Sequence, residues 1–221
     1  MYNVSVDHKN HSSVGKRRYH SRIRQRQAKE THQRLLAVAR ELLASKGYAN
    51  VTLEMIAEAA EVSPKTISAV FGSKRGLLTA LINPATFGDP FQQLLTQIRS
   101  TPEPALRVSL VAKLTRQAYE PFVPEFELLR TASAVAPELA DLARQIETRR
   151  RQNQGRLIAY LDERHMLRQD LSPEEAADVL WTLTGYDLYR LLVVERRWPP
   201  ERYETWLAQL LIHHLLRPGE G

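Results

Sequence analysis

The sequence of this 221-residue chain predicts an all-α fold. Apolar residues recur at three- and four-residue spacing along most of the chain, which is the period of one helix face. Two Ser-Pro pairs and further prolines separate these stretches, and a serine N-cap followed by proline typically starts a helix. No stretch alternates apolar and polar residues between turn pairs, so we expect no sheet.

The first strongly periodic helix is predicted to end at Lys46-Gly47. A cation in the last turn followed by glycine is a typical C-terminal signal. The helix carries an apolar stripe formed by Leu35, Leu36, Ala39, Leu42 and Leu43.

Residues 51–71 are predicted to form two short helices joined by a tight turn. Ser63-Pro64 starts the second helix, because proline at the first helical position loses no hydrogen bond. We expect Phe71-Gly72 to end it and Ser73 to open another helix. A small core is expected from both helices and the turn: Ile56, Ala57, Ala60, Val62, Ile67 and Val70.

The second helix of this hairpin is predicted to point one cation, two hydroxyls and one methyl outward, from Lys65, Thr66, Ser68 and Ala69. Such groups suit phosphates, base edges and thymine methyls in a DNA major groove. The alternative is an ordinary helical hairpin without a nucleic-acid partner.

Residues 35–81 resemble the N-terminal domain of the TetR (tetracycline repressor) family of bacterial transcriptional regulators. The resemblance implies a three-helix helix-turn-helix DNA-binding domain followed by a helical ligand-binding and dimerisation domain. We expect a basic arm at 1–26, the DNA-binding domain at 27–82 and the second domain at 83–221. The matching elements are the helix Leu35–Leu43, Gly47-Tyr48, Val51-Thr52, Ile56-Ala57, Val62-Ser63, Phe71-Gly72-Ser73-Lys74 and Leu77-Leu78.

Three residues depart from the family pattern. Glu61 replaces the glycine usual in the hairpin turn, where a left-handed backbone is convenient, so we expect strain or another turn shape. Ser68 replaces a tyrosine that often contacts phosphate, and Val70 replaces a histidine. The fold assignment survives these changes, whereas the family's contact map does not transfer whole.

We expect DNA contacts from the hairpin and from both of its flanks. Thr52, which caps the first hairpin helix, and Lys74, at the start of the next helix, are expected to anchor to phosphates. The full set of expected DNA-binding residues is Thr52, Ser63, Lys65, Thr66, Ser68, Ala69 and Lys74.

Charge is distributed unevenly along the chain. Residues 1–80 hold 14 basic and 6 acidic side chains, a balance of +8, whereas residues 81–221 have a balance of −2. The N-terminal arm has few large aliphatic residues, so we expect it to be disordered in the free protein. It either lies along DNA phosphates or the minor groove, or acts as a solubilising tail. Its candidate DNA contacts are Arg17, Arg18, Arg22, Arg24 and Arg26.

The second domain reads as helices separated by prolines. Helices are expected to start at Pro104 and Pro137, at Ser172-Pro173 with an end near Arg197, and after Pro199-Pro200. The middle of the long helix from Pro137, residues 147–156, is so polar that we expect it to project past the core.

The last two helices carry long apolar faces with aromatic anchors. In TetR-type proteins such helices pair with their two-fold copies in a four-helix bundle, so a homodimer on a palindromic operator is expected. The alternative is a helix pair in the core of one subunit, because interfaces and cores share aromatic enrichment. The candidate interface residues are Trp181, Leu188, Leu191, Tyr203, Trp206 and Leu210.

The resemblance also implies a small-molecule effector bound by the second domain, but the sequence does not identify it or its contacts. Arg116 or Asp187 is a candidate for recognising a polar group, or a surface charge. Seven aromatic residues either line a cavity or simply pack: Tyr119, Phe122, Phe126, Tyr160, Trp181, Tyr186 and Tyr189.

Other functional classes lack support in the sequence. There is no cysteine, no His-Glu-x-x-His helix, no phosphate loop and no dinucleotide turn, so we expect no catalytic residues, metal or cofactor. No apolar stretch reaches the ~18 residues of a membrane span. We therefore expect a bacterial cytoplasmic regulator, by analogy a repressor relieved by an effector. The competing hypothesis is a sequence-indifferent DNA scaffold that uses the basic arm and the dimer bundle.

Overall fold

The chain folds as predicted into helices. The computed structural model describes residues 12–83, 88–134 and 136–218, with side chains from residue 25 onward. Within these ranges the only β-pairing is an isolated bridge between Leu167 and Leu216. In the same ranges, no helix is both long and apolar enough to span a membrane.

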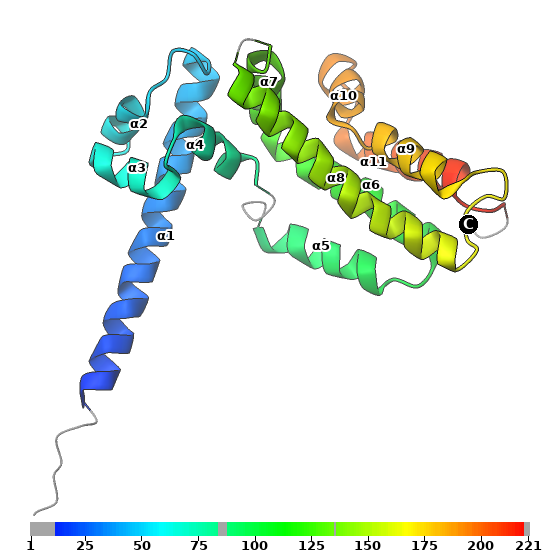
Figure 1. Cartoon of the computed structure of the whole chain (residues 1–221), viewed down its shortest axis with the longest axis horizontal. Coiled ribbons are helices and arrows are strands. Elements are labelled where there is room, and N and C mark those ends of the chain that lie inside the picture. Colours follow the sequence, from blue (N-terminus) through cyan, green and yellow to red (C-terminus); the bar gives the residue numbers. More distant parts are fainter. Residues whose placement is uncertain (1–11, 84–87, 135, 219–221) are drawn as a thin grey trace, which may run out of the picture.

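Four helices come first along the chain (Figure 1). They are α1 (Ser12–Lys46), α2 (Leu53–Ala59), α3 (Pro64–Phe71) and α4 (Lys74–Leu81). We call residues 27–82 the head and residues 83–221 the body. Helix α1 ends at Lys46 and Gly47 follows with φ +76°, as the sequence predicts.

The body is a layered set of helices beside the head (Figure 1). Its elements are α5 (Gly88–Ser100), α6 (Pro104–Tyr119), the short 3₁₀ turn η2 (Glu120–Phe122), α7 (Val123–Ala132), α8 (Pro137–Glu163), α9 (Pro173–Leu183), α10 (Tyr186–Tyr189), the π-helical turn η3 (Arg190–Glu195) and α11 (Pro200–Leu215). The helix expected from Ser172 to about Arg197 is therefore interrupted at Gly185.

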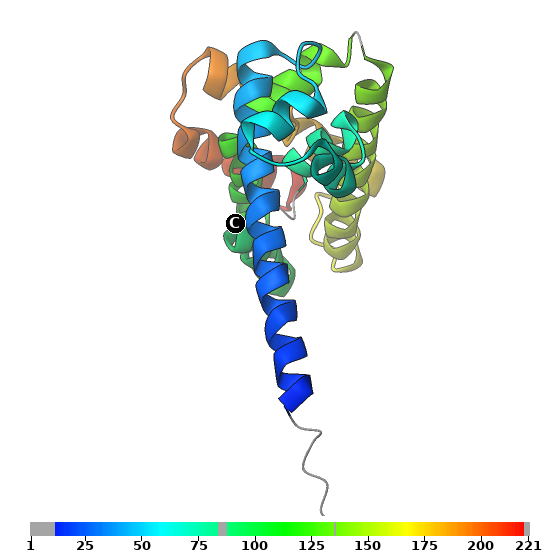
Figure 2. The same cartoon turned by 90° about the vertical axis from the view of Figure 1, so that its left-hand side faces the viewer.

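Residues 12–26 are helical, so the prediction of a disordered arm is wrong for this segment; residues 1–11 lie outside the described residues. No proline or glycine occurs from residue 16 to residue 46, and Arg, Gln, Lys, Glu and Ala favour helix. The segment also extends an already packed helix, so it needs no new nucleus. Figure 2 shows this half of α1 standing clear of the other helices.

Two apolar cores hold the chain together. The first lies within the body, between α5, α6, α8, α9, α10 and α11. The second contains the interior of the head and extends into the body through Leu129 and Ala132 of α7 and Leu139 and Leu142 of α8. The head therefore packs against α7 and α8 of the body, in addition to its covalent link through the chain after α4.

The polar middle of α8 does not project past the core, contrary to expectation. Glu147 accepts a hydrogen bond from the Trp181 indole N–H at 2.9 Å, and Arg150 donates to the Trp181 carbonyl at 2.7 Å. Arg150 and Gln154 also donate to the Thr184 hydroxyl, at 3.0 and 2.6 Å. The polar side chains of α8 thus bind the carboxyl end of α9, which has unpaired carbonyls to offer.

Candidate nucleic-acid interface

Helix α3 is held at both ends by local chemistry. The Ser63 hydroxyl accepts a hydrogen bond from the Thr66 N–H at 3.1 Å, and Pro64 occupies the first turn. Gly72 follows the helix with φ +71°, a conformation that glycine adopts without strain. These caps confirm the predicted limits of the helix and fix it as a short, rigid element.

The outer side of α3 is as predicted. Lys65, Ser68 and Ala69 are exposed, whereas Ile67 is fully buried in the head core. Thr66 is half-buried, and its hydroxyl lies 2.9 Å from the hydroxyl of exposed Ser63. The structure therefore gathers five of the seven expected contact residues near the amino end and outer face of α3, with Thr52 and Lys74 on the flanking helices.

Val70 does not close the core of the hairpin, so that prediction is wrong. Its side chain is 41% exposed, and Phe71 takes the inward position instead. The Phe71 ring lies 5.1 Å from the His32 ring of α1. Residues 67 and 71, four apart, share a helix face more closely than residues 67 and 70 do. Val70 thus adds an apolar side chain to the outer surface, which the family pattern did not suggest.

The turn between α2 and α3 carries the strain expected from the missing glycine. Glu61 has φ +54°, in the left-handed region that non-glycine residues seldom adopt. Two hydrogen bonds impose this shape: Glu61 N–H donates to the Glu58 carbonyl at 3.0 Å, and Val62 N–H donates to the Ala57 carbonyl at 2.9 Å.

Replacing Glu61 by glycine is expected to stabilise the head. Glycine removes a left-handed conformational cost of about 1 kcal/mol, partly offset by its larger unfolded-state entropy. We expect Glu61→Gly to raise the thermal unfolding midpoint by about 2 °C in circular dichroism. Glu61→Ala is the matched control, because it removes the same charge but keeps the β-carbon. A midpoint that rises equally in both variants would show that charge, not backbone strain, is relieved.

Thr52 caps α2 as predicted. Its hydroxyl oxygen accepts a hydrogen bond from the Met55 N–H at 3.2 Å, and the residue is exposed. The hydroxyl hydrogen is not needed for this bond. That hydrogen already has a partner in the head: the pKa of the Glu54 carboxylate is lowered by its own backbone N–H and by a hydrogen bond from the Thr52 hydroxyl.

The Lys74 ammonium is engaged within the head, and the expected phosphate contact stays a prediction. The ammonium donates to the carbonyls of Tyr48 and Val51, the second at 2.8 Å, and lies 4.1 Å from the centre of the Tyr48 ring. Burial lowers the pKa of Lys74, consistent with its withdrawal from water. With two of three N–H donors committed, Lys74 ties the α1–α2 loop to α4 and holds the Thr52 cap in place.

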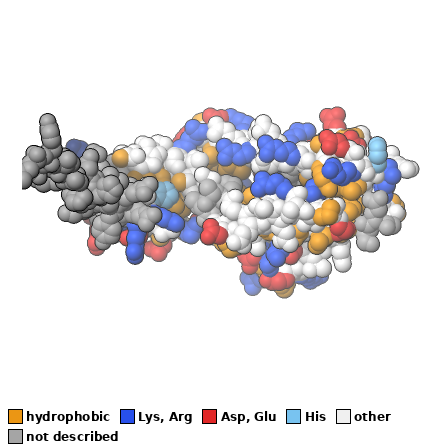
Figure 3. Space-filling model, turned by 90° about the horizontal axis from the view of Figure 1, so that it is seen from below, with side chains coloured by type: hydrophobic (Ala, Val, Ile, Leu, Met, Phe, Trp, Pro, Cys, Tyr) orange, Lys and Arg blue, Asp and Glu red, His pale blue; other side chains and the backbone are white. Residues whose placement is uncertain are grey.

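The expected arm residues all lie on α1. Arg26 is exposed and pairs with Glu30 one turn later, at 2.8 Å. For Arg17, Arg18, Arg22 and Arg24 the structure gives the helical backbone only. Positive charge is not confined to the head, since Lys and Arg side chains also gather on the underside of the body (Figure 3).

The expected dimer residues divide into exposed and buried groups. Trp181 and Leu191 are 37% and 42% exposed, and Val194 beside them is 40% exposed. Leu188, Trp206 and Leu210 are half-buried. Tyr203 is fully buried, so its prediction as an interface residue is wrong: its ring lies 5.0 Å from that of Tyr189, in the layer between α11 and α6.

Four of the seven aromatic residues considered for an effector cavity contact one another. The Tyr119 ring lies 5.0, 5.3 and 5.6 Å from those of Phe126, Tyr186 and Tyr189. The other three lie elsewhere: Phe122 is beneath Arg40, Tyr160 is between Arg107 and Arg164, and Trp181 is at the surface. Arg116 pairs with Glu201 at 2.6 Å and Glu204 at 2.8 Å, and Asp187 is exposed.

Residues 35–81 match the family described as bacterial regulatory proteins, tetR family. The head of this chain is therefore similar to a TetR-family domain. The match spans the end of α1 through α4, which are the elements that build the capped hairpin. No curated protein has a significantly similar sequence.

Solved structures extend the TetR-like fold to most of the chain. The SmeT–triclosan complex has a TM-score of 0.70 at 18% identity, covering 87% of this chain and 94% of that one. NalD from Pseudomonas aeruginosa, the secondary repressor of the MexAB-OprM multidrug efflux pump, has 0.67 at 19%, covering 87% and 99%. A transcriptional regulator from Saccharomonospora viridis in complex with choline has 0.63 at 21%, covering 86% and 99%. At these identities the likeness shows the TetR-like fold.

Proposed function

We propose that this chain is a DNA-binding transcriptional regulator that inserts α3 into the major groove of its operator. The observation that carries the proposal is the capped α3 of a TetR-family head, with Lys65, Ser68 and Ala69 exposed on one side. An α-helix of this size fits the major groove, which is about 12 Å wide.

Each outer residue of α3 has a complementary group in DNA. Lys65 supplies a cation for a phosphate or a guanine edge, and Ser68 supplies a hydroxyl for a base edge. Ala69 and exposed Val70 present methyl groups that can contact thymine. Thr52 and Ser63, at the amino ends of α2 and α3, lie where a phosphate is favoured by helix N–H groups.

The regulator is proposed to act as a homodimer. Trp181 of α9 and Leu191 and Val194 of η3 are exposed apolar side chains, and exposed apolar surface often marks a protein partner. A two-fold dimer places two α3 helices one helical turn of DNA, or a multiple, apart. The operator is then a palindrome.

We further propose repression that is relieved by a small molecule, with the protein in the bacterial cytoplasm beside its DNA. NalD is a repressor, and the SmeT and Saccharomonospora viridis structures hold triclosan and choline. In this chain the aromatic cluster of Tyr119, Phe126, Tyr186 and Tyr189 is the proposed binding region. Arg116 is less suited to a ligand, because two carboxylates already hold it.

The proposal is tested by selecting bound fragments from a genomic DNA pool and footprinting them at moderate salt. A protected palindrome supports the regulator. Uniform weak protection supports the alternative, a sequence-indifferent DNA scaffold that uses the dimer bundle and the basic α1 extension, residues 12–26. Lys65→Ala separates the two further, since a regulator loses more affinity for the selected site than for random DNA.

The α1 extension is proposed to contact phosphates beside the operator, through Arg17, Arg18, Arg22, Arg24 and Arg26. A helix about 10 Å wide cannot enter the minor groove, which is about 6 Å wide. We therefore expect a sequence-independent contribution to affinity rather than base recognition.

Deleting residues 1–26 is expected to reduce the slope of log affinity against log salt by several units, about 0.9 for each phosphate that the protein no longer neutralises. Fluorescence anisotropy across a salt series measures it. Gln27→Pro keeps every charge of the extension but breaks the helix, and Gln27→Ala is its control, with the helix intact. An unchanged salt slope in the deletion variant would show that the extension does not contact DNA.

A further inference from the structure

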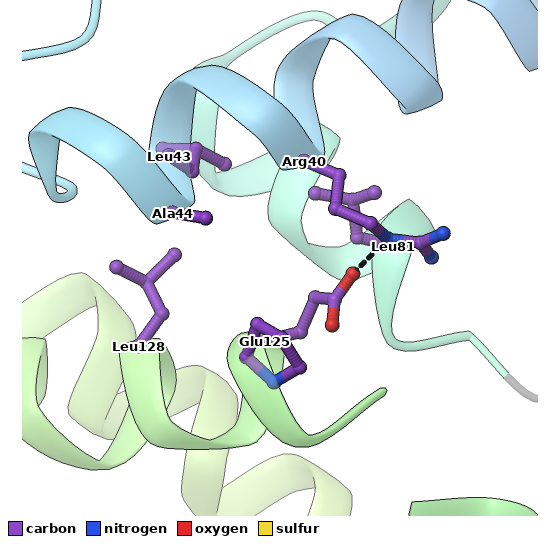
Figure 4. Close-up of a pocket in the computed structure, with 7 residues that line it drawn as sticks. Arg40, Leu43, Ala44, Leu81, Glu125 and Leu128 are labelled. Atoms are coloured by element: carbon purple, nitrogen blue, oxygen red, sulfur yellow. Dashed lines mark hydrogen bonds and ion pairs between the residues drawn. The ribbon is translucent and has the colours of Figure 1, made fainter. Parts of the chain in front are cut away.

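Helices α1 and α4 of the head pack against α7 and α8 of the body. One joint lies where α1 and the end of α4 meet α7. Figure 4 shows Leu43 and Ala44 of α1 facing Leu128 of α7, with Arg40 reaching Glu125. Leu81 of α4 and Pro124 also line the small gap at this joint. The surroundings of the Glu125 carboxylate are therefore mainly apolar.

Among the described residues, one ion pair crosses this apolar joint. A hydrogen bond from Arg75 of α4 to Gln145 of α8, at 3.1 Å, is a second polar contact between head and body. The Arg40 guanidinium donates from Nε to Oε1 of Glu125, 85 residues later, and lies 5.4 Å from the centre of the Phe122 ring. The Glu125 side chain is only 3% exposed, whereas that of Arg40 is 43% exposed. Among the described residues, Oε2 of Glu125 has no hydrogen-bond partner although it is buried.

This arrangement favours one angle between the head and the body over others. A buried carboxylate is costly unless a cation or a hydrogen-bond donor satisfies it. Any movement of the head that carries Arg40 away leaves Glu125 buried and unpaired. The apolar contacts alone would tolerate small rotations, because they have no direction. The ion pair therefore disfavours intermediate angles.

The same helix also reaches the aromatic cluster. Phe126, next to Glu125, stacks on Tyr186 with ring centres 4.9 Å apart. Glu127 accepts a hydrogen bond from the Tyr186 hydroxyl at 3.0 Å. Consecutive residues of α7 thus contact the head and the proposed effector region. One short helix therefore connects Tyr186 to Glu125.

We propose that Arg40 and Glu125 are positioning residues that hold the head at its DNA-binding angle, and that α7 relays changes in the aromatic cluster to this pair. The inference rests on the proposed function and deepens it. It places the coupling at the α1–α7 joint.

The inference is tested first without DNA, by the distance between two spin labels. The chain has no cysteine, so Ser45→Cys in the head and Ser100→Cys in the body give a unique pair. Both residues are exposed, and dilution with unlabelled chain removes distances between subunits. We expect one narrow distance distribution in the labelled parent and a broad one after Glu125→Gln or Arg40→Gln. Arg144→Gln, which breaks an exposed pair with Asp141, is the control.

The second readout is operator spacing. In the selected operator, each single variant is expected to lose about tenfold affinity and to discriminate less against a spacer lengthened by one base pair. Binding to an isolated half-site should not change, and the double variant should lose no more than either single one. If the variants lose equal affinity for the half-site and the full operator, the Arg40–Glu125 pair only stabilises the fold. A narrow distribution of spin-label distances in the variants would overturn the inference. If the distance distribution broadens in the variants but the parent protects no operator, the role of the ion pair in holding the head is supported and the proposed DNA-binding function is rejected.

Discussion

Gly76→Ala is expected to unfold the head and abolish operator binding. A β-carbon at this position would lie 2.0 Å from the carbonyl oxygen of Phe71, which is backbone at the end of α3. Relief requires α3 and α4 to separate, so we expect a loss of about 3 kcal/mol in the free energy of unfolding. Urea unfolding followed by circular dichroism measures the loss.

Gly155→Ala is the matched control for this change. Gly155 lies within α8, and a β-carbon there meets nothing within 4 Å. Alanine favours helix over glycine by about 1 kcal/mol, so this variant should be slightly more stable than the parent. If Gly76→Ala proves as harmless as Gly155→Ala, the close packing of α4 on the end of α3 is refuted.

Ser68→Glu is expected to abolish operator binding while leaving the fold intact. Ser68 is exposed on the outer face of α3, so the new carboxylate costs little in the free protein. In the complex it would face phosphates and replace a base contact, and we expect a loss of at least about 100-fold, roughly 3 kcal/mol. Fluorescence anisotropy with the selected operator gives the affinity.

The control for Ser68→Glu is the same substitution at Ser100, which is exposed at the end of α5 in the body. It adds the same charge to the chain, so any loss from net charge alone appears in both variants. Unchanged binding by Ser68→Glu would mean that this face of α3 does not meet DNA.

The sequence predicted the capped elements well because a cap is a local interaction. Thr52, Ser63, Ser73 and Ser172 each accept a hydrogen bond from an N–H three residues later, where the helices begin. The left-handed turn at Glu61 was also predictable, since a missing glycine in a known turn leaves few backbone shapes.

Predictions that depended on which face a residue presents were less reliable. Val70 and Phe71 differ by one residue, yet only Phe71, four residues after buried Ile67, turns inward and meets His32 of α1. Tyr203 is an aromatic residue of the kind enriched at interfaces, but it is buried within its own subunit against Tyr189. The burial of Tyr203 depends on tertiary packing, which helical periodicity does not specify.

The least predictable residues were those with long-range polar partners. Lys74 binds carbonyls 23 and 26 residues earlier in the chain, and Arg40 binds Glu125 across 85 residues. Disorder is the wrong prediction for the basic segment at 12–26, because low apolar content does not prevent residues that favour helix from extending one.

The most direct test of the central claim, that α3 lies in the major groove, uses the absence of cysteine. Ser68→Cys provides one attachment site on α3 for an iron chelate that cleaves nearby DNA. The account predicts cleavage at two positions related by the operator's two-fold axis, one helical turn or a multiple apart, and none from the same chelate at Ser100→Cys. Operator binding that persists without cleavage from position 68 would contradict it.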